Sequence, residues 1–186
     1  MHILIISSSL NKESRSRLLA EAAAEQFKAL QLSCELLDIG EYEIPLCDGD
    51  RCFQHPLVSV INDKLERASA IILAMPIYNF ALSAAAKNFV ELTGERWRGK
   101  VVGLMAAAGG NRSYMGIMTM ASSLMLDYHC LVVPEFVFAA TSDFTEEERL
   151  SKTLPPDILE RIMKLGATVA SLAKCWNTVR EELDMV

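Results

Sequence analysis

Residues 3–19 read ILIISSSLNKESRSRLL, and this stretch decides the fold. Four apolar residues end abruptly at three serines, Ser7 to Ser9, and a helical pattern begins at Ser14. A continuous apolar run is typical of a strand buried on both faces, as parallel sheets require. Serine hydroxyls and backbone N–H groups at the start of the helix would favour an anion such as a phosphate, because the helix dipole is positive there. Two interpretations follow: a strand–loop–helix phosphate cradle, or a first βα turn in which serine only caps the helix.

Composition limits the classes of protein to which the chain can belong. It has 186 residues, 51% of them hydrophobic, and a formal net charge of −6. We expect one globular domain spanning residues 1–186. The negative charge and the lack of a basic cluster argue against nucleic-acid and anionic-membrane partners. No apolar run approaches the ~20 residues that span a bilayer, the N-terminus lacks a signal-peptide pattern, and the five cysteines are widely spaced, so we expect no membrane association and a cytoplasmic location.

Apolar runs alternate with helical periodicities along the whole chain. Strands are expected at residues 3–6, 33–39, 70–75, 100–107 and 130–140, the last interrupted by Pro134. Helices are expected at 14–30, 57–68, 83–93 and 114–126, and from Pro155 onward. We interpret residues 40–56 as a long loop and the acidic segment 143–148 as a solvated loop. This alternation predicts an α/β fold with a parallel sheet and right-handed crossovers.

The last predicted helix carries a long apolar seam. Its members recur at spacings of four and three: Ile158, Ile162, Leu165, Val169, Leu172, Trp176, Val179 and Leu183. We expect this helix to pack on the sheet, and its last third, around Trp176, offers a second possibility as a subunit contact.

Three polar loops follow the first, third and fourth predicted strands. They are SSSLNKESRS (7–16), PIYNFALS (76–83) and AAGGNRS (107–113). In a five-stranded sheet ordered 2-1-3-4-5, these three strands are neighbours, and ligands bind beyond their carboxyl ends at the switch point in strand order. The pattern predicts a ligand with a phosphate at the first loop and a flat group against the other two.

These three loops resemble those of the NADPH-dependent FMN reductases of the flavodoxin-like superfamily, particularly the branch that serves two-component monooxygenases. Members carry a G-S-x-x-x-x-S-x-S/N first loop, a P-x-Y-N/K turn and a Gly-Gly turn, which match residues 8–16, 76–79 and 109–110 here. The chain departs from the pattern at Ser8, which replaces the usual Gly, and at Asn11, where many relatives have Arg. Ser8 is compatible with the loop only at negative φ, and the loss of the Arg would weaken the hold on FMN.

The resemblance implies a flavodoxin-like three-layer sandwich and a NAD(P)H-dependent FMN reductase whose cofactors are FMN and NAD(P)H. The first loop would hold the FMN phosphate, and the other two would line the isoalloxazine ring and ribityl chain. The cofactor-binding residues implied are Ser9, Asn11, Ser14, Arg15, Ser16, Pro76, Ile77, Tyr78, Asn79, Ala108, Gly109, Gly110, Asn111, Arg112 and Ser113. It also implies a homodimer or homotetramer, a small-molecule electron acceptor and a flavin-dependent monooxygenase as a partner.

Hydride transfer between stacked rings needs geometry rather than an acid, a base or a nucleophile. We therefore expect no catalytic side chain, which agrees with three scattered histidines. Arg112 is a candidate for a pyridine-nucleotide phosphate, or alternatively an exposed arginine at a helix start. Cys47 and Cys52, with His55 nearby, are too few for a cluster or a structural zinc site, so we expect no metal.

Three alternatives to a flavin reductase remain open. One is an enzyme with permanently bound FMN that reduces a quinone, an azo compound or a metal oxyanion. Another is a flavodoxin-type electron carrier, which the sequence disfavours because Tyr78 is the only obvious aromatic residue available to cover the ring. The last is a family member that has lost FMN and acts only as an interaction partner.

Overall fold

The structure is a computed structural model that describes residues 1–184. Its centre is a seven-stranded sheet in which five strands lie in the order β2-β1-β3-β5-β6. β7 also pairs in parallel with β5, and β4 pairs antiparallel with β3. The strands are β1 (Ile3–Ser7), β2 (Cys34–Asp38), β3 (Ala70–Tyr78), β4 (Ala81–Leu82), β5 (Val101–Ala108), β6 (Leu131–Val132) and β7 (Val137–Ala140).

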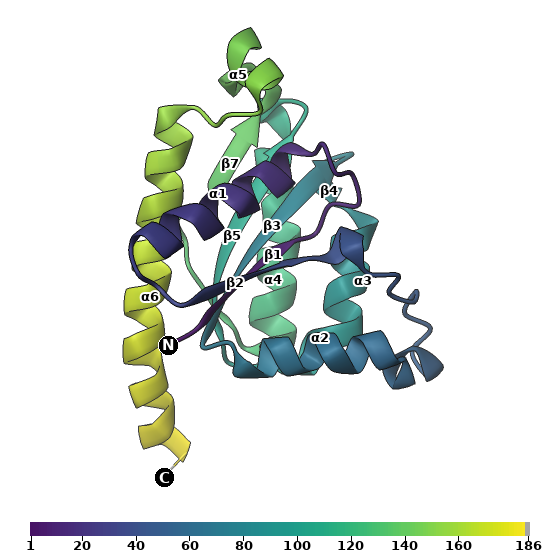
Figure 1. Cartoon of the computed structure of the whole chain (residues 1–186). Coiled ribbons are helices and arrows are strands. Elements are labelled where there is room, and N and C mark those ends of the chain that lie inside the picture. The colour runs from purple at the N-terminus through teal and green to yellow at the C-terminus, as the bar shows by residue number, and fades with distance from the viewer. Residues whose placement is uncertain (185–186) are drawn as a thin grey trace.

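Helices cover both faces of the sheet, which gives three layers (Figure 1). The helices are α1 (Arg15–Ala29), α2 (Pro56–Arg67), α3 (Ala84–Thr93), α4 (Ile117–Tyr128), α5 (Glu146–Ser151) and α6 (Pro156–Asp184). Ile3 and Ile5 of β1 pack with residues of α1 and α6 on one face. Leu4 and Ile6 point to the other face and pack with residues of α2, α3 and α4. The continuous apolar run at the start of the chain is therefore buried on both sides, and the predicted α/β class with a parallel sheet is confirmed.

The predicted set of five strands is wrong in its count, for two reasons. Proline cannot donate a ladder hydrogen bond, and Pro134 divides the last predicted strand into β6 and β7. The third strand also continues past Pro76, where Ile77 pairs with Ala108 of β5. Its extension turns back into the additional short strand β4, in which Leu82 pairs with Ile77.

The acidic segment was expected to be a solvated loop, and this expectation is wrong. Residues 146–151 form the short helix α5. Thr145 Oγ1 accepts a hydrogen bond from Glu148 N (3.2 Å), while Glu148 Oε2 accepts one from Thr145 N (2.8 Å). This reciprocal capping box starts the helix. The run of three glutamates is compatible with it, because negative side chains are favoured at the positive N-terminus of a helix.

The long last helix packs on the sheet as expected. Ile162 and Val169 are fully buried, and Gly166 lets α6 approach α1 closely, because a Cβ there would lie 2.0 Å from Phe27 Cε1. Trp176 Nε1 donates to Gly99 O at 2.7 Å, so this side chain is held by its own chain. The side chain of Leu183 lies outside the described part of the chain. Within residues 1–184, no helix is both long enough and apolar enough to cross a membrane.

Candidate functional site

The first loop is anchored to the neighbouring strand by Ser8. Both its backbone N and its Oγ donate to Ala74 O of β3, each at 2.9 Å. Ser8 is fully buried and does not adopt a positive φ. A serine is therefore compatible with this position, and its hydroxyl fastens the loop where the related pattern has glycine.

Short-range hydrogen bonds shape the rest of this loop. Ser9 Oγ accepts from Asn11 N at 3.2 Å, and Asn11 Oδ1 accepts from Glu13 N at 3.0 Å. Ser14 N donates to Asn11 O at 3.1 Å, which closes the turn into α1. Asparagine favours such turns because its side chain bonds the backbone two residues later. Asn11 thus shapes this turn through its side-chain and backbone oxygens.

The N-terminus of α1 presents hydroxyls and amides at one spot. Ser14 caps the helix by accepting from Arg17 N at 3.2 Å, and Ser16, which is buried, places its Oγ 3.3 Å from Ser14 Oγ. The backbone amides of Arg15 and Ser16 lie in the first turn, where no acceptor exists within the helix. Hydroxyls, first-turn amides and the helix dipole together form a cradle suited to a phosphate.

Arg15 connects this cradle to the end of β5. Its Nη2 donates to Ala108 O at 3.3 Å, and its Cζ lies 5.8 Å from the centroid of the Phe144 ring. The guanidinium is therefore fixed by a carbonyl and an aromatic face, and no carboxylate neutralises it in these contacts.

The second loop is a tight hairpin between β3 and β4. Its two central residues, Asn79 and Phe80, have φ values of 51° and 64°, as type I′ turns require. Positive φ is a genuine outlier for a bulky residue such as Phe80. Gly116 makes room beneath this turn, because a Cβ there would lie 2.9 Å from Phe80 O.

The third loop begins at Gly109 and continues into the 3₁₀ helix Asn111–Gly116. Ser113 Oγ donates to Gly110 O at 2.9 Å, and Asn111 Nδ2 donates to Ser142 Oγ at 3.1 Å. Arg112 is exposed. These bonds tie the loop to its own first turn and to Ser142, which follows β7.

The three loops meet in two adjoining cavities at the carboxyl edge of the sheet. The first, of about 420 Å³, is lined from all three loops, by Asn11, Glu13, Ser14, Arg15, Ser16, Pro76, Ile77, Tyr78, Ala107, Ala108 and Gly109. The second, of about 330 Å³, is lined by Ile77, Asn79, Phe80, Gly109, Gly110, Asn111, Arg112 and Ser113. Of the residues predicted from the sequence, only Ser9 lines neither cavity, because it is buried within the first loop. We call these two spaces together the three-loop site.

The cysteine-bearing loop is not part of this site. Cys47 Sγ and Cys52 Sγ lie 3.9 Å apart, and His55 Nδ1 accepts from Leu57 N at 3.3 Å to cap α2. Burial raises the pKa of the Cys47 thiol. Among the described residues, no group of three or more His, Cys, Asp or Glu side chains is arranged to hold a metal ion.

Three residues that line the three-loop site, Glu13, Phe80 and Ala107, and one element beside the site were missed in the sequence. Phe80, adjacent to the predicted P-x-Y-N turn, lines the second cavity because the hairpin turns it outward. Phe144 and α5 lie beside Arg15, and the T-x-x-E pattern of the capping box at Thr145 was the signal that would have located them.

A parallel sheet with helices on both faces, and three loops converging at its carboxyl edge around a phosphate-type cradle, define a flavodoxin-like nucleotide-binding protein. The profile of the NADPH-dependent FMN reductases matches residues 1–145, and the chain belongs to this family.

Individual relatives agree with this assignment. An NAD(P)H-dependent FAD/FMN reductase of Geobacillus thermodenitrificans is 25% identical over 177 residues, covering 92% of this chain and 93% of the relative. An NADPH azoreductase of a Bacillus species is 27% identical over 140 residues, covering 74% and 75%. The flavoenzyme NAD(P)H:(acceptor) oxidoreductase FerB of Paracoccus denitrificans has the same fold, with a TM-score of 0.71 at 17% identity, covering 95% of this chain and 97% of FerB.

Proposed function

We propose that this protein is a NAD(P)H-dependent flavin reductase that binds FMN in the three-loop site. The observation that carries this proposal is the cavity of about 420 Å³ to which all three loops contribute. Its phosphate-type cradle lies at one end, and the hairpin and the Gly-Gly loop lie at the other. The family and the names of its relatives support the same reaction class.

The residues present fit FMN. The Ser14 and Ser16 hydroxyls and the first-turn amides of α1 would hold the phosphate, and Arg15 supplies a positive charge beside it. Ser8 does not obstruct the cradle, because its side chain is bonded to β3. The backbone of the hairpin and of Gly109 and Gly110 would flank the ring.

When bound, FMN supplies a ring that accepts a hydride from NAD(P)H and passes electrons to an acceptor. The protein's own task is to position two flat ligands and to keep the phosphate end fixed. Glu13 is the only carboxylate that lines either cavity of the three-loop site within the described residues, and it is exposed and paired with Lys152. The site therefore works by orientation and not by proton transfer from a buried acid.

A second candidate is a reductase that keeps its FMN and reduces a quinone or azo compound. The observation that favours it is an apolar rim around the three-loop site, where Leu10, Tyr78, Phe80, Tyr114 and Met115 are exposed. Such a rim suits a flat, weakly polar acceptor, and one relative is named an azoreductase.

The same rim would also suit a second copy of the chain, so our proposal includes a homodimer or homotetramer. It also includes a flavin-dependent monooxygenase as a recipient of reduced flavin. All five cysteines are free, and we place the protein in the cytoplasm.

The visible spectrum of the purified protein, followed by NADPH and NADH oxidation with free FMN and with a quinone, tests both candidates. Turnover of added FMN by a colourless protein supports the flavin reductase. Turnover of a quinone by a yellow protein that keeps its FMN supports the second candidate. A protein that neither binds FMN nor oxidises either nucleotide would exclude both.

A further inference from the structure

A third cavity lies between the N-terminal turns of α1 and the short helix α5. It has a volume of about 330 Å³, and four cations line it: Lys12, Arg15, Arg149 and Lys152. Three carboxylates line it as well: Glu13, Glu21, which pairs with Arg17, and Glu148, which caps α5. Glu13, Ser14 and Arg15 also line the cavity of about 420 Å³ in the three-loop site, so these residues form the boundary between the two spaces. We call this third cavity the α1–α5 cavity.

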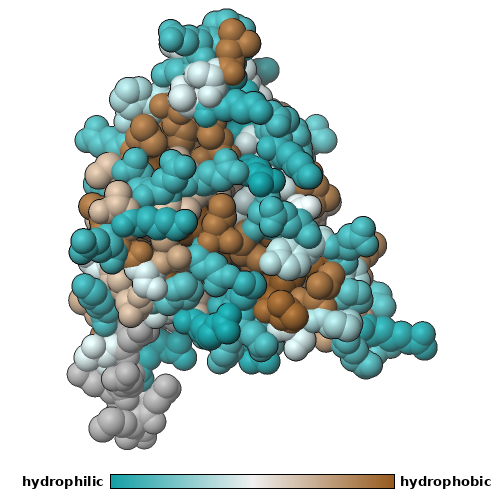
Figure 2. Space-filling view, viewed as in Figure 1, coloured by the Kyte–Doolittle hydropathy of each residue, from teal (hydrophilic) through white to brown (hydrophobic). Residues whose placement is uncertain are grey.

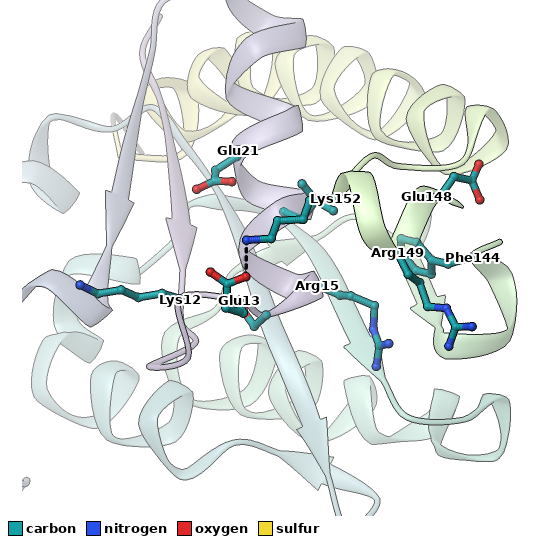
Figure 3. A pocket seen from close by; sticks show the side chains of 10 residues that line it. Lys12, Glu13, Arg15, Glu21, Phe144, Glu148, Arg149 and Lys152 are labelled. Atoms are coloured by element: carbon teal, nitrogen blue, oxygen red, sulfur yellow. Dashed lines mark ion pairs between the residues drawn. The ribbon is translucent and has the colours of Figure 1, made fainter. Parts of the chain in front are cut away.

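Two of its cations, Arg149 and Lys152, are held by weak, exposed ion pairs. Lys152 points to Glu13 across the cavity (Figure 3), and each of these side chains is 64% exposed. Arg149 pairs with Glu146 on the same helix, also in an exposed position. Exposed ion pairs contribute little to stability, so an incoming anion can take over either cation at low cost.

The cavity also has an apolar floor. Phe144 is almost fully buried and Leu18 is half-buried, and the surface between α1 and α5 is a mixture of hydrophobic and hydrophilic areas (Figure 2). The Arg15 guanidinium lies over the Phe144 ring, and Arg15 and Arg149 extend in the same general direction (Figure 3). A planar base can stack on such a guanidinium, while an anionic group reaches the lysine and the second arginine.

We infer that the α1–α5 cavity binds the adenosine 2′-phosphate end of NADPH. This inference rests on the proposed function, which places the nicotinamide in the three-loop site. Arg15 lies between this cavity and the phosphate end of the three-loop site, so a dinucleotide whose nicotinamide lies against the flavin ring would extend past the FMN phosphate into the α1–α5 cavity. A space of about 330 Å³ suits a single nucleotide unit. Arg149 and Lys152 supply the charge that distinguishes NADPH from NADH.

The Glu13–Lys152 pair gives this inference a distinctive consequence. The carboxylate of Glu13 and the 2′-phosphate compete for the same ammonium group. Removing the carboxylate therefore strengthens binding of the phosphate, whereas removing the ammonium weakens it. A cavity that only stabilises the fold would show neither effect.

Calorimetric titration of the full chain with adenosine 2′,5′-bisphosphate, with 5′-AMP as the reference, tests the inference without any turnover. We expect the bisphosphate to bind at least tenfold more tightly than 5′-AMP. Arg149→Ala and Lys152→Ala should each weaken its binding about tenfold, and Glu13→Gln should tighten it severalfold. Lys164→Ala is the matched control, because Lys164 is likewise an exposed lysine paired with a glutamate, Glu135, and it should change nothing.

Equal binding of the two nucleotides, or equal binding by Arg149→Ala, Lys152→Ala and the control, would overturn the inference. NADH-driven FMN reduction reports separately on the proposed function. If that activity is present while the bisphosphate titrations fail, the reductase stands and the α1–α5 cavity has no role in nucleotide choice. A loss of affinity for the bisphosphate in Arg112→Ala but not in Arg149→Ala would show that the 2′-phosphate binds at the third loop, and this would also overturn the inference.

Discussion

Two loops of this protein are built alike, yet only one borders the three-loop site. The first loop (8–14) follows β1, and the long loop (residues 42–55) comes after β2. Each ends in a residue whose side chain caps the next helix, Ser14 for α1 and His55 for α2. Each also contains a side-chain oxygen that bonds the backbone two residues later, on Asn11 and on Asp48.

The difference lies in where the two loops stand in the sheet. β1 lies between β2 and β3, and its carboxyl end is beside that of β3, which in turn adjoins β5, whereas β2 is an edge strand. The long loop packs against α3, where Asn88 Oδ1 accepts from Cys47 N at 2.8 Å, and Cys52 is buried with Leu92. A capped helix and a hydrogen-bonded loop are therefore common structural devices, and of these two loops only the one at the switch point in strand order borders the three-loop site.

The largest expected effect comes from a charge placed in the cradle. Ser16→Glu puts a carboxylate beside the first-turn amides of α1, and we expect FMN affinity to fall more than a hundredfold because like charges repel at close range. Titration of FMN fluorescence measures this. Ser59→Glu is the matched control: Ser59 is an exposed serine in the first turns of α2, the helix that follows the long loop, and this substitution should leave FMN affinity unchanged. Unchanged affinity in Ser16→Glu would mean that the phosphate binds elsewhere.

The two caps provide the most direct comparison between the loops. Ser14→Ala and His55→Ala each remove a cap, so each should lower the free energy of unfolding by about 1 kcal/mol in urea denaturation. Only Ser14→Ala also removes a hydroxyl from the cradle, and it should weaken FMN binding about tenfold. A similar loss of FMN affinity in His55→Ala would show that the effect is one of general stability.

The charge missing from the first loop can be restored. Asn11→Arg places a guanidinium at the position where the family pattern implied by the resemblance often has arginine, and we expect FMN binding to tighten about fivefold through a charge-assisted hydrogen bond. The gain is limited because Glu13 N loses the acceptor that Asn11 provides. Gln54→Arg adds the same charge to the long loop, where it should have no effect. An equal gain in both variants would attribute the effect to net charge alone.

The class of fold and the placement of the three loops could be predicted from the sequence. Apolar runs such as residues 3–6 and 70–75 are buried on both faces, and this double burial produces the pattern from which the parallel sheet was inferred. Pro76 and Gly109 follow such runs, and in a parallel sheet the ends of neighbouring strands meet at one edge. Local pattern and strand order together therefore predicted which three loops form the three-loop site, and the resemblance to the FMN reductases implied the individual residues.

The parts that were missed depend on contacts between distant residues or on weak local signals. Arg15 reaches Ala108, 93 positions away in the chain, and no local pattern encodes that bond. The hairpin has Asn79 followed by Phe80, whereas the strong signal for such a turn is Asn followed by Gly. At Thr145 a local signal was present, but the run of glutamates suggested a solvated loop rather than the favourable first turn of a helix.

The smallest expected effect is a difference between the two loops in how their contribution to stability depends on pH. The hydrogen bonds from Asp50 N and then Cys52 lower the pKa of Asp48 to about 2, from an ordinary value of 3.8. Since the folded-state pKa is the lower one, this carboxylate stabilises the fold above about pH 4, and the contribution is lost as the pH falls toward 2. Asn11 makes the same kind of turn with a neutral amide and does not titrate. Urea midpoints between pH 7 and pH 2 should therefore show wild type and Asp48→Asn converging at the acid end, by a small amount because Asp48 is exposed. A difference that stays constant over this range would mean that the turn at Asp48 depends on its shape and not on its charge, and the two loops would then be alike in this respect also.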